Sequence, residues 1–390
     1  MTITALAPLD PRGWTEEQRA LRDSARTFVE REVAPHLTQW EAERGLPREL
    51  HRVAAKQGFL GVSFPEEVGG SGGGLMDSVA LTEAILESGG SGGLIASLFT
   101  HGIALPHIVM SGNADLIDRY VRPTLAGETI GSLAITEPGG GSDVANLRTT
   151  AVRDGDHYVV NGSKTFITSA VRADFVTTAV RTGGPGYKGI SLLVIDKDTP
   201  GFTVTRKLEK LGWHCSDTAE LGFVDARVPV TNLVGEENSG FVQIAMAFVT
   251  ERVGLAVQGY GTAQRCLDLS VAYVKDREAF GGPLISNQVV RHKLVAMHRM
   301  IEAARIYTRE VARRYDNGEQ PLVEALHAKK LGVDAAKFCV DQAVQLHGGT
   351  GYMNGTEVEM HYRDSRILGI GGGADEVLDD LVAKLLGYGA

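Results

Sequence analysis

Apolar and polar residues follow a helical period at both ends of the chain and a period of two between them. Thr15, before Glu16 and Glu17, is an expected helix N-cap, and the run GGSGGG at 69–74 predicts a loop. The pattern predicts helices over residues 14–57, 76–87, 93–110 and 114–125 in the first third, and over 240–264, 286–315, 322–346 and 375–386 after Asn238.

The middle of the chain, from about Ile130, is rich in β-branched and aromatic residues. Asp154-Gly155 and Asn161-Gly162 are typical of two-residue hairpin turns. Strands are predicted at residues 157–160, 165–168, 175–180, 190–195, 202–205 and 220–224. Short strands with closely spaced turns predict an antiparallel sandwich or barrel. We therefore expect an α+β fold, with an N-terminal helical domain (1–128), a central β domain (129–237) and a C-terminal helical bundle (238–390).

The stretch from Gly240 to Gln264 is apolar around most of the helix and carries only two charges, Glu251 and Arg252. Ile244, Ala247, Phe248, Gly254 and Leu255 share the face of Glu251, whereas Arg252 points about 100° away. Burial raises the pKa of a carboxyl group, so Glu251 is a candidate general base. A structural ion pair with a cation from another helix is the alternative interpretation.

Charge and cysteine content indicate which binding partners and which cellular compartment to expect. The formal net charge of −9 argues against a nucleic-acid partner or an anionic membrane. The three cysteines form no CxxC pair, which favours a reducing compartment, and we expect a cytoplasmic protein. The uncharged interval 88–114 contains His101, Pro106, His107 and several glycines, so it indicates buried helices rather than a membrane span.

One motif match is rejected. Gly184, Gly186 and Gly189 satisfy the dinucleotide pattern GxGxxG, but a strand-like segment, ISLLVID, follows where a helix is required. We interpret these glycines as a turn. The chain has no P-loop, HExxH, GxSxG or paired CxxC, so no metal site is predicted.

Six segments together resemble the acyl-CoA dehydrogenase family. They are LAITEPGGGSD (133–143), TFITSA (165–170), SDTAELGFVDARVPVTNLVGEENSGF (216–241), DREAFGGPLISNQ (276–288), QLHGGTGY (345–352) and YRDSRILGIGGG (362–373). The resemblance implies a helical domain, a β domain and a four-helix bundle, assembled as a homotetramer with one FAD per subunit. It also implies α,β-dehydrogenation of an acyl-CoA, with the β-hydrogen leaving as hydride to the flavin and electrons passing to an electron-transfer flavoprotein.

The resemblance assigns cofactor contacts position by position. Residues expected to line the flavin are Leu133, Ile135, Thr136, Ser142, Phe166, Ile167, Thr168, Ala374 and Glu376. Residues expected to reach the FAD of a neighbouring subunit are Arg277, Phe280, Gln288, Gln345, Leu346, Gly348 and Gly349. Ser142 is also expected near the acyl-CoA, and Arg277 suits a pyrophosphate.

One departure from the family pattern decides the expected base. Many members carry a catalytic Glu where this chain has Gly372. A subgroup acting on branched short-chain or long-chain acyl-CoAs instead places its Glu on the first helix of the bundle, before an Arg, which matches Glu251-Arg252. We therefore expect Glu251 to be the base. Gly372, with Gly373, should flank the thioester and present a backbone N–H to its carbonyl. Arg252 is expected to be a substrate-side or structural cation.

Three alternatives remain at this level. An acyl-CoA oxidase and a dehydrogenase of carrier-protein thioesters would use the same half-reaction. A non-catalytic binding protein that keeps the flavin fold would explain the missing carboxylate at Gly372 in another way.

Overall fold

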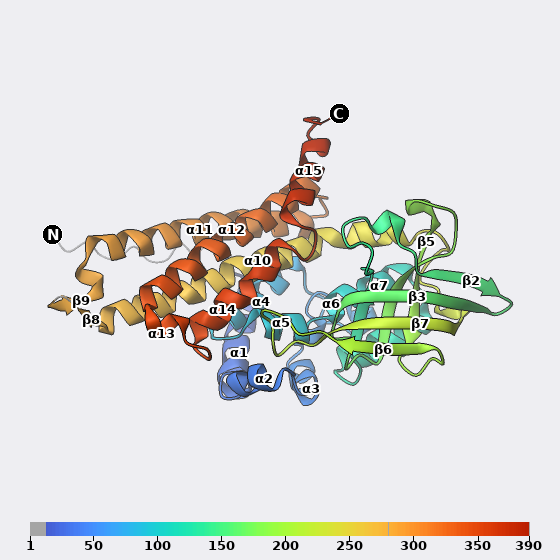
Figure 1. The fold of residues 1–390 in the computed structure, drawn as a ribbon, viewed down its shortest axis with the longest axis horizontal. Coiled ribbons are helices and arrows are strands. Elements are labelled where there is room, and N and C mark those ends of the chain that lie inside the picture. The colour runs from blue at the N-terminus through green and yellow to red at the C-terminus, as the bar shows by residue number, and fades with distance from the viewer. Residues whose placement is uncertain (1–12, 280, 390) are drawn as a thin grey trace.

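The computed structural model describes residues 13–279 and 281–389. Helices occupy the chain up to Leu125, strands lie between Gly131 and Pro229, and helices return at Gly240. Figure 1 shows the sheet at one end of an elongated molecule, with the long helices of the last third extending away from it. The expected α+β fold is confirmed.

The N-terminal helices are more numerous than the periodicity predicted. Thr15 caps the first of them as expected: its hydroxyl accepts from the Gln18 N–H at 3.2 Å, and the Gln18 side chain accepts from the Thr15 N–H. The single helix predicted over 14–57 is wrong, because Pro35 and Pro47 interrupt it. The helices are α1 (Glu16–Phe28), α2 (Leu37–Glu43), α3 (Glu49–Lys56), α4 (Leu75–Glu87), α5 (Gly92–Leu98), α6 (His101–Ala104), α7 (Pro106–Ser111), α8 (Ala114–Leu116) and α9 (Arg122–Leu125).

Seven strands of the described residues form one sheet. They are β1 (Gly131–Ala134), β2 (Thr150–Asp154), β3 (His157–Thr168), β4 (Phe175–Arg181), β5 (Ile190–Asp196), β6 (Phe202–Lys207) and β7 (Thr218–Pro229). The strand order is β1-β4-β2-β3-β7-β6, and β5 pairs with β4. Most strand pairs are antiparallel. Strand β1 pairs with β4 in parallel, with Gly131 opposite Phe175, and β2 joins β4 through a single parallel bridge. This parallel register positions the end of β1 beside the helices.

One of the two predicted hairpins is wrong. Asp154-Gly155 does begin the turn between β2 and β3, and Gly155 has φ 62°. Asn161-Gly162 instead lies inside β3, at a bulge opposite β7. Gly162 has φ 147°, and a Cβ there would lie 2.6 Å from the Thr149 hydroxyl. Both sites need an unusual backbone angle, so the dipeptide pattern alone does not distinguish a turn from a bulge.

The bundle is built around α10 (Gly240–Asp276), which α4, α11 and α12 contact. A Cβ on Gly259 would overlap the backbone of Gly332, so α10 and α12 cross in close contact there. By length and composition α10 could cross a membrane, and 39% of its most apolar stretch is buried among the described residues. The other elements are β8 (Glu278–Ala279), β9 (Gly282–Pro283), α11 (Gln288–Asp316), α12 (Leu322–His347), α13 (Gly349–Tyr352), α14 (Glu357–Ser365) and α15 (Asp375–Leu385).

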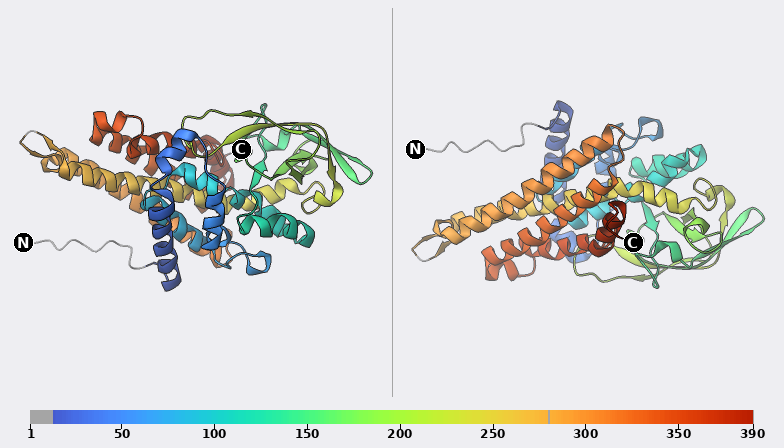
Figure 2. Two further views of the ribbon diagram at one scale, coloured as in Figure 1. Left: turned by 90° about the horizontal axis from the view of Figure 1, so that it is seen from below. Right: turned by 90° about the horizontal axis from the view of Figure 1, so that it is seen from above.

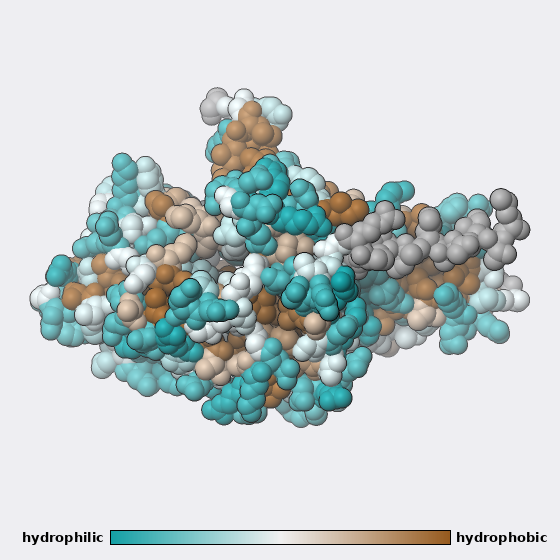
Figure 3. Space-filling view, turned by 180° about the vertical axis from the view of Figure 1, so that it is seen from behind, coloured by the Kyte–Doolittle hydropathy of each residue, from teal (hydrophilic) through white to brown (hydrophobic). Residues whose placement is uncertain are grey.

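Helix α15 stands away from the body of the molecule in Figure 1, and the views of Figure 2 look along this projection. Val377, Leu385, Leu386 and Tyr388, in and just after this helix, are exposed. Figure 3 shows a largely apolar surface on this projection. An exposed apolar surface of this kind is typical of a contact with another protein chain.

Candidate active site

A small, narrow cavity lies between the end of β1, the short helices α6 and α7, and the first turns of α10. Its lining residues are Gly102, Ile103, His107, Leu133, Ile135, Ile244, Ala247, Phe248 and Glu251. The four α10 residues recur at a spacing of three and four, so they form one face of that helix. This face is the one predicted from the sequence.

Glu251 brings a carboxylate into a wall whose other residues, except His107, are apolar or glycine. Burial raises its pKa above 4.5, and the positive charges of Arg252 and Lys329 offset only part of that shift. Within the described residues, the carboxylate makes no hydrogen bond and no ion pair. The alternative of a structural ion pair therefore finds no partner here, and the arrangement suits a proton acceptor.

Arg252 lies behind the wall. Its guanidinium stacks over the ring of Phe248, with the carbon 4.7 Å from the ring centroid, and its buried Nε has no hydrogen-bond partner. Arg252 is absent from the described lining of the cavity. Its expected contact with substrate stays a prediction.

Gly372 lies directly beside Glu251. Its φ is 63°, and a Cβ built on it would overlap Leu255 Cδ1 and lie 3.3 Å from Glu251 Oε1. A side chain at 372 would therefore require the Leu255 side chain to move and would hold a strained backbone angle. Among the described residues, no acceptor is bonded to the Gly372 N–H. The turn thus offers a free backbone donor next to a carboxylate.

Lys329 holds this turn, and the sequence analysis missed it. From α12 its ammonium donates to the carbonyl of Gly371 at 2.7 Å and to that of Gly373. Burial lowers the pKa of Lys329 to about 8, although Asp375 and Glu251 act to raise it. Two adjacent lysines on a helix carry no signal of this role, because the partner carbonyls come from a segment 42 residues further along.

The two segments expected to contact flavin lie side by side. The Thr165 N–H donates to the Thr136 carbonyl at 2.9 Å, and the buried Lys164 donates to the Ile135 carbonyl at 2.9 Å. A bulge then gives Phe166 a φ of 61° and leaves this residue 69% exposed. An exposed aromatic ring held in a strained backbone suits stacking against a planar ring system. Ile167 is buried, Thr168 is half-buried, and Ser142 lies in the exposed loop that follows Thr136.

The remaining expected cofactor residues lie elsewhere. Ala374 is the N-cap of α15, and Glu376 lies in its first turn, close to Gly373. The other group lies at the far end of the bundle, where the rings of Tyr273 and His347 stack 4.3 Å apart. That group comprises Arg277, Gln288, Gln345, Leu346, Gly348 and Gly349; all except Leu346 are exposed. Phe280 lies outside the described residues.

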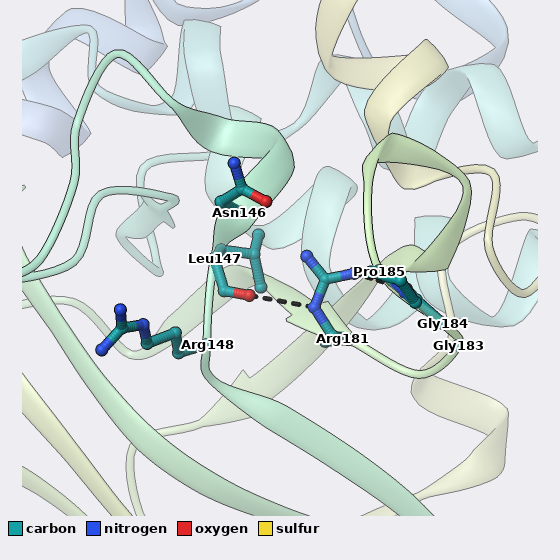
Figure 4. Close-up of a pocket in the computed structure, with 7 residues that line it drawn as sticks. All are labelled: Asn146, Leu147, Arg148, Arg181, Gly183, Gly184 and Pro185. Atoms are coloured by element: carbon teal, nitrogen blue, oxygen red, sulfur yellow. Dashed lines mark hydrogen bonds between the residues drawn. The ribbon is translucent and has the colours of Figure 1, made fainter.

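A wider hollow on the β domain has a different character. Figure 4 shows it between the segment 146–148 and the loop 183–185, with Arg148 pointing away from Arg181. The Arg181 guanidinium donates to the carbonyls of Ala145, Leu147 and Gly184 at 2.7, 3.0 and 2.6 Å. Its donors are used within the loop, which includes the glycines interpreted as a turn. Arg181 therefore shapes this loop.

Three family models match nearly the whole chain. They describe the N-terminal, middle and C-terminal domains of acyl-CoA dehydrogenase, and they match residues 15–128, 132–226 and 238–387. Mitochondrial isobutyryl-CoA dehydrogenase from Bos taurus is 35% identical, over 97% of this chain and 91% of that protein.

Solved structures are similar over the same length. A Mycobacterium smegmatis protein assigned to the acyl-CoA dehydrogenases is 60% identical, with a TM-score of 0.96 and coverage of 97% of this chain and 99% of that chain. A chain in the structure of the electron transferring flavoprotein of Acidaminococcus fermentans is 33% identical, with a TM-score of 0.92 and coverage of 96% and 99%.

We predict that Lys329→Met loosens the turn at 371–373. The substitution removes both bonds of a charged donor and leaves two carbonyls unpaired, while the volume of the side chain is nearly kept. Amide hydrogen exchange of this segment should accelerate by roughly tenfold or more, as measured by mass spectrometry. Lys330→Met is the matched control, because that lysine pairs with Asp334 at the surface of the same helix. Equal exchange in the two variants would contradict the role of Lys329.

Proposed function

The chain belongs to the acyl-CoA dehydrogenase family, and on this premise we propose that Glu251 removes the α-proton of its acyl-CoA substrate. Members of this family are FAD-dependent oxidoreductases that dehydrogenate acyl-CoA thioesters, and the cofactor here is FAD. The observation that supports the choice of base is the unpartnered carboxylate of Glu251 beside Gly372, 3.3 Å from the space that a side chain there would occupy.

The backbone at Gly372 complements that base. Its free N–H is proposed to bond the thioester carbonyl oxygen, where negative charge develops as the α-proton leaves. This bond acidifies the α-carbon and is ready before the reaction, because Lys329 holds the carbonyls on either side of Gly372. Glu251 then only has to accept the proton from the substrate α-carbon that lies against its side of the cavity.

FAD, when bound, accepts the β-hydrogen as a hydride. We propose that Leu133, Ile135, Thr136, Ser142 and the segment 166–168 hold it, with Ala374 and Glu376 closing the same side. Leu133 and Ile135 also line the cavity, so one edge of the acyl site is shared with the cofactor surface. The apolar lining excludes water from the proton acceptor, which keeps its pKa raised.

The second group of cofactor residues supports an oligomer. Arg277 lies 26 residues beyond Glu251 on α10, which corresponds to about 39 Å along the helix. These residues are therefore too far from Glu251 to contact the reactive ring of a flavin bound beside that residue. We propose that they complete the FAD site of a neighbouring subunit in a homotetramer, with the exposed apolar surface of α15 as part of the contact.

An electron-transferring flavoprotein is the proposed electron acceptor. The similarity to a chain in the structure of such a flavoprotein supports this assignment. Steady-state turnover should require the flavoprotein or an artificial mediator. Rapid turnover in air without a mediator would instead favour an oxidase.

We predict that Glu251→Gln lowers the rate of flavin bleaching by acyl-CoA by a factor on the order of 10²–10⁴, because general-base catalysis contributes about that much. The measurement is anaerobic stopped-flow absorbance with a panel of straight and branched acyl-CoAs. Asp268→Asn is the matched control on the same helix, since its side chain bonds Gln264 away from the cavity. Bleaching at the wild-type rate in Glu251→Gln would refute the assignment.

The same step should depend on pH in a defined direction. Because the pKa of Glu251 is raised, a fraction of the base is protonated and inactive at moderately acid pH. The bleaching rate should therefore increase as pH rises and level off above the pKa of Glu251, with an inflection above the ordinary value of 4.5. An unchanged rate through the acid range would contradict a buried carboxylate as base.

We predict that Arg277→Ala weakens FAD binding without changing the oligomeric state of the protein. Loss of a charged hydrogen bond to the pyrophosphate should raise the dissociation constant for FAD by about 10–100-fold. Equilibrium titration of the apoprotein measures the affinity, and native mass spectrometry measures the assembly. Arg277→Lys should restore part of the affinity. The proposal of a shared site would be contradicted if the wild-type protein were monomeric and bound FAD as tightly as the assembled protein is expected to.

A further inference from the structure

The residue that follows the proposed flavin segment 166–168 is strained as well. Phe166 has φ 61° and Ser169 has φ 62°, so two residues with left-handed backbone angles enclose the pair between them. Ser169 is fully buried, and its N–H donates to the carbonyl of Asp217 at 2.9 Å. A strained residue other than glycine persists only where its surroundings hold it. The partners of the Ser169 hydroxyl therefore show what this bend is fixed to.

The Ser169 hydroxyl lies in the middle of a hydrogen-bond chain between two domains. Arg172 Nη2 donates to Ser169 Oγ at 3.3 Å, and Ser169 Oγ lies 2.7 Å from Thr100 Oγ1. The Thr100 hydroxyl lies 2.6 Å from the carbonyl oxygen of Ala96. Because a guanidinium only donates and a carbonyl only accepts, Ser169 donates to Thr100, and Thr100 donates to Ala96. Hydrogen bonds in such a chain strengthen one another.

Arg172, at the donor end of the chain, is held by both domains. Its Nε donates to the Asp217 carboxylate at 2.8 Å, which also accepts from the Val171 N–H at 2.8 Å. From the N-terminal domain, the carbonyls of Ser97 and Leu46 accept from Arg172 at 2.8 and 3.2 Å, and the Ser97 hydroxyl accepts as well. The guanidinium is therefore fixed in place, and it holds the Ser169 oxygen toward Thr100.

Both walls of the acyl cavity are bonded to this bent segment. Thr100 is the N-cap residue of α6, and the N–H of Ile103, a lining residue, donates to the Thr100 carbonyl at 3.1 Å. On the other wall, the Ser132 hydroxyl donates to the Thr168 carbonyl at 2.5 Å, next to the lining residue Leu133. The proposed flavin segment thus connects the α6 wall and the β1 wall.

We infer that Thr100 and Ser169 are positioning residues, and that the bond between their hydroxyls sets the α6 wall of the acyl cavity against the flavin surface. The inference rests on the proposed function and adds two residues that contact neither the reacting carbon nor the base. Transfer of the β-hydrogen requires a close and defined approach of the acyl chain to the flavin, so a small displacement lowers the rate more than the affinity. Loss of the hydroxyl bond should therefore reduce turnover at saturating acyl-CoA.

Ser169→Gly tests this role without straining the fold. Glycine removes the hydroxyl and adopts φ 62° readily, so the variant should be folded and bind FAD. The FAD-loaded proteins are mixed anaerobically with the acyl-CoA that bleaches the wild-type flavin fastest. The limiting bleaching rate should fall about tenfold, while the half-saturating concentration changes by less than about threefold. An unchanged limiting rate in Ser169→Gly overturns this inference alone. No bleaching of the wild-type protein by any acyl-CoA overturns the proposed function as well.

A double-mutant cycle assigns the effect to the bond between the two hydroxyls. Thr100→Val should lower the limiting rate to a similar extent, and combining it with Ser169→Gly should cause little further loss, because both changes break the same chain. Thr100→Ser keeps the hydroxyl and should retain most of the rate. Thr124→Val is the matched control, since it breaks a buried 2.8 Å bond to the Thr129 hydroxyl, and neither residue lines the cavity. Losses that multiply in the double variant, or an equal loss in Thr124→Val, contradict the positioning role.

Discussion

The site depends on the close approach of the glycine turn at Gly372 to the Glu251 carboxylate. A side chain at 372 would overlap Leu255 and approach the Glu251 carboxylate, and its backbone would be strained at φ 63°. The carboxylate therefore comes from α10, while the turn contributes only backbone. Lys329 completes the arrangement, because the half-buried turn lacks regular secondary structure and would otherwise have two unpaired carbonyls. Three separate segments thus meet beside the Glu251 carboxylate.

The position of Glu251 depends in turn on how α10 is held. Helix α10 crosses α12 closely at Gly259 and Gly332, because a Cβ on either glycine would overlap the backbone of the facing helix. This close packing restricts rotation of α10 about its axis. Lys329 comes from the same α12, so the crossing fixes both the proposed base and the residue that orients its neighbouring turn. An unpaired carboxylate in an apolar wall is unfavourable, and the extensive packing of α10 provides the stability that tolerates it.

Sequence periodicity predicted the long elements well, since α12 was expected over 322–346 and is Leu322–His347. It failed where short breaks decide the path, as at Pro35, because apolar residues keep a helical rhythm on both sides of the break. The neighbours of Glu251 followed from helix geometry alone, since they belong to one helix. Lys329 could not be found this way. Its role depends on carbonyls that another segment supplies, and local patterns contain no record of those contacts.

The cavity has two walls, and substitutions in them are expected to have different effects on cofactor binding. Leu133 and Ile135 belong to the segment that also faces the proposed flavin surface, and Thr136 is bonded to the strand that carries Phe166. A substitution in that wall would change cofactor and acyl contacts together. Gly102, Ile103 and His107 come from α6 and α7, which contribute none of the proposed cofactor contacts. Acyl preference can therefore be altered on the α6–α7 side at little cost to the cofactor.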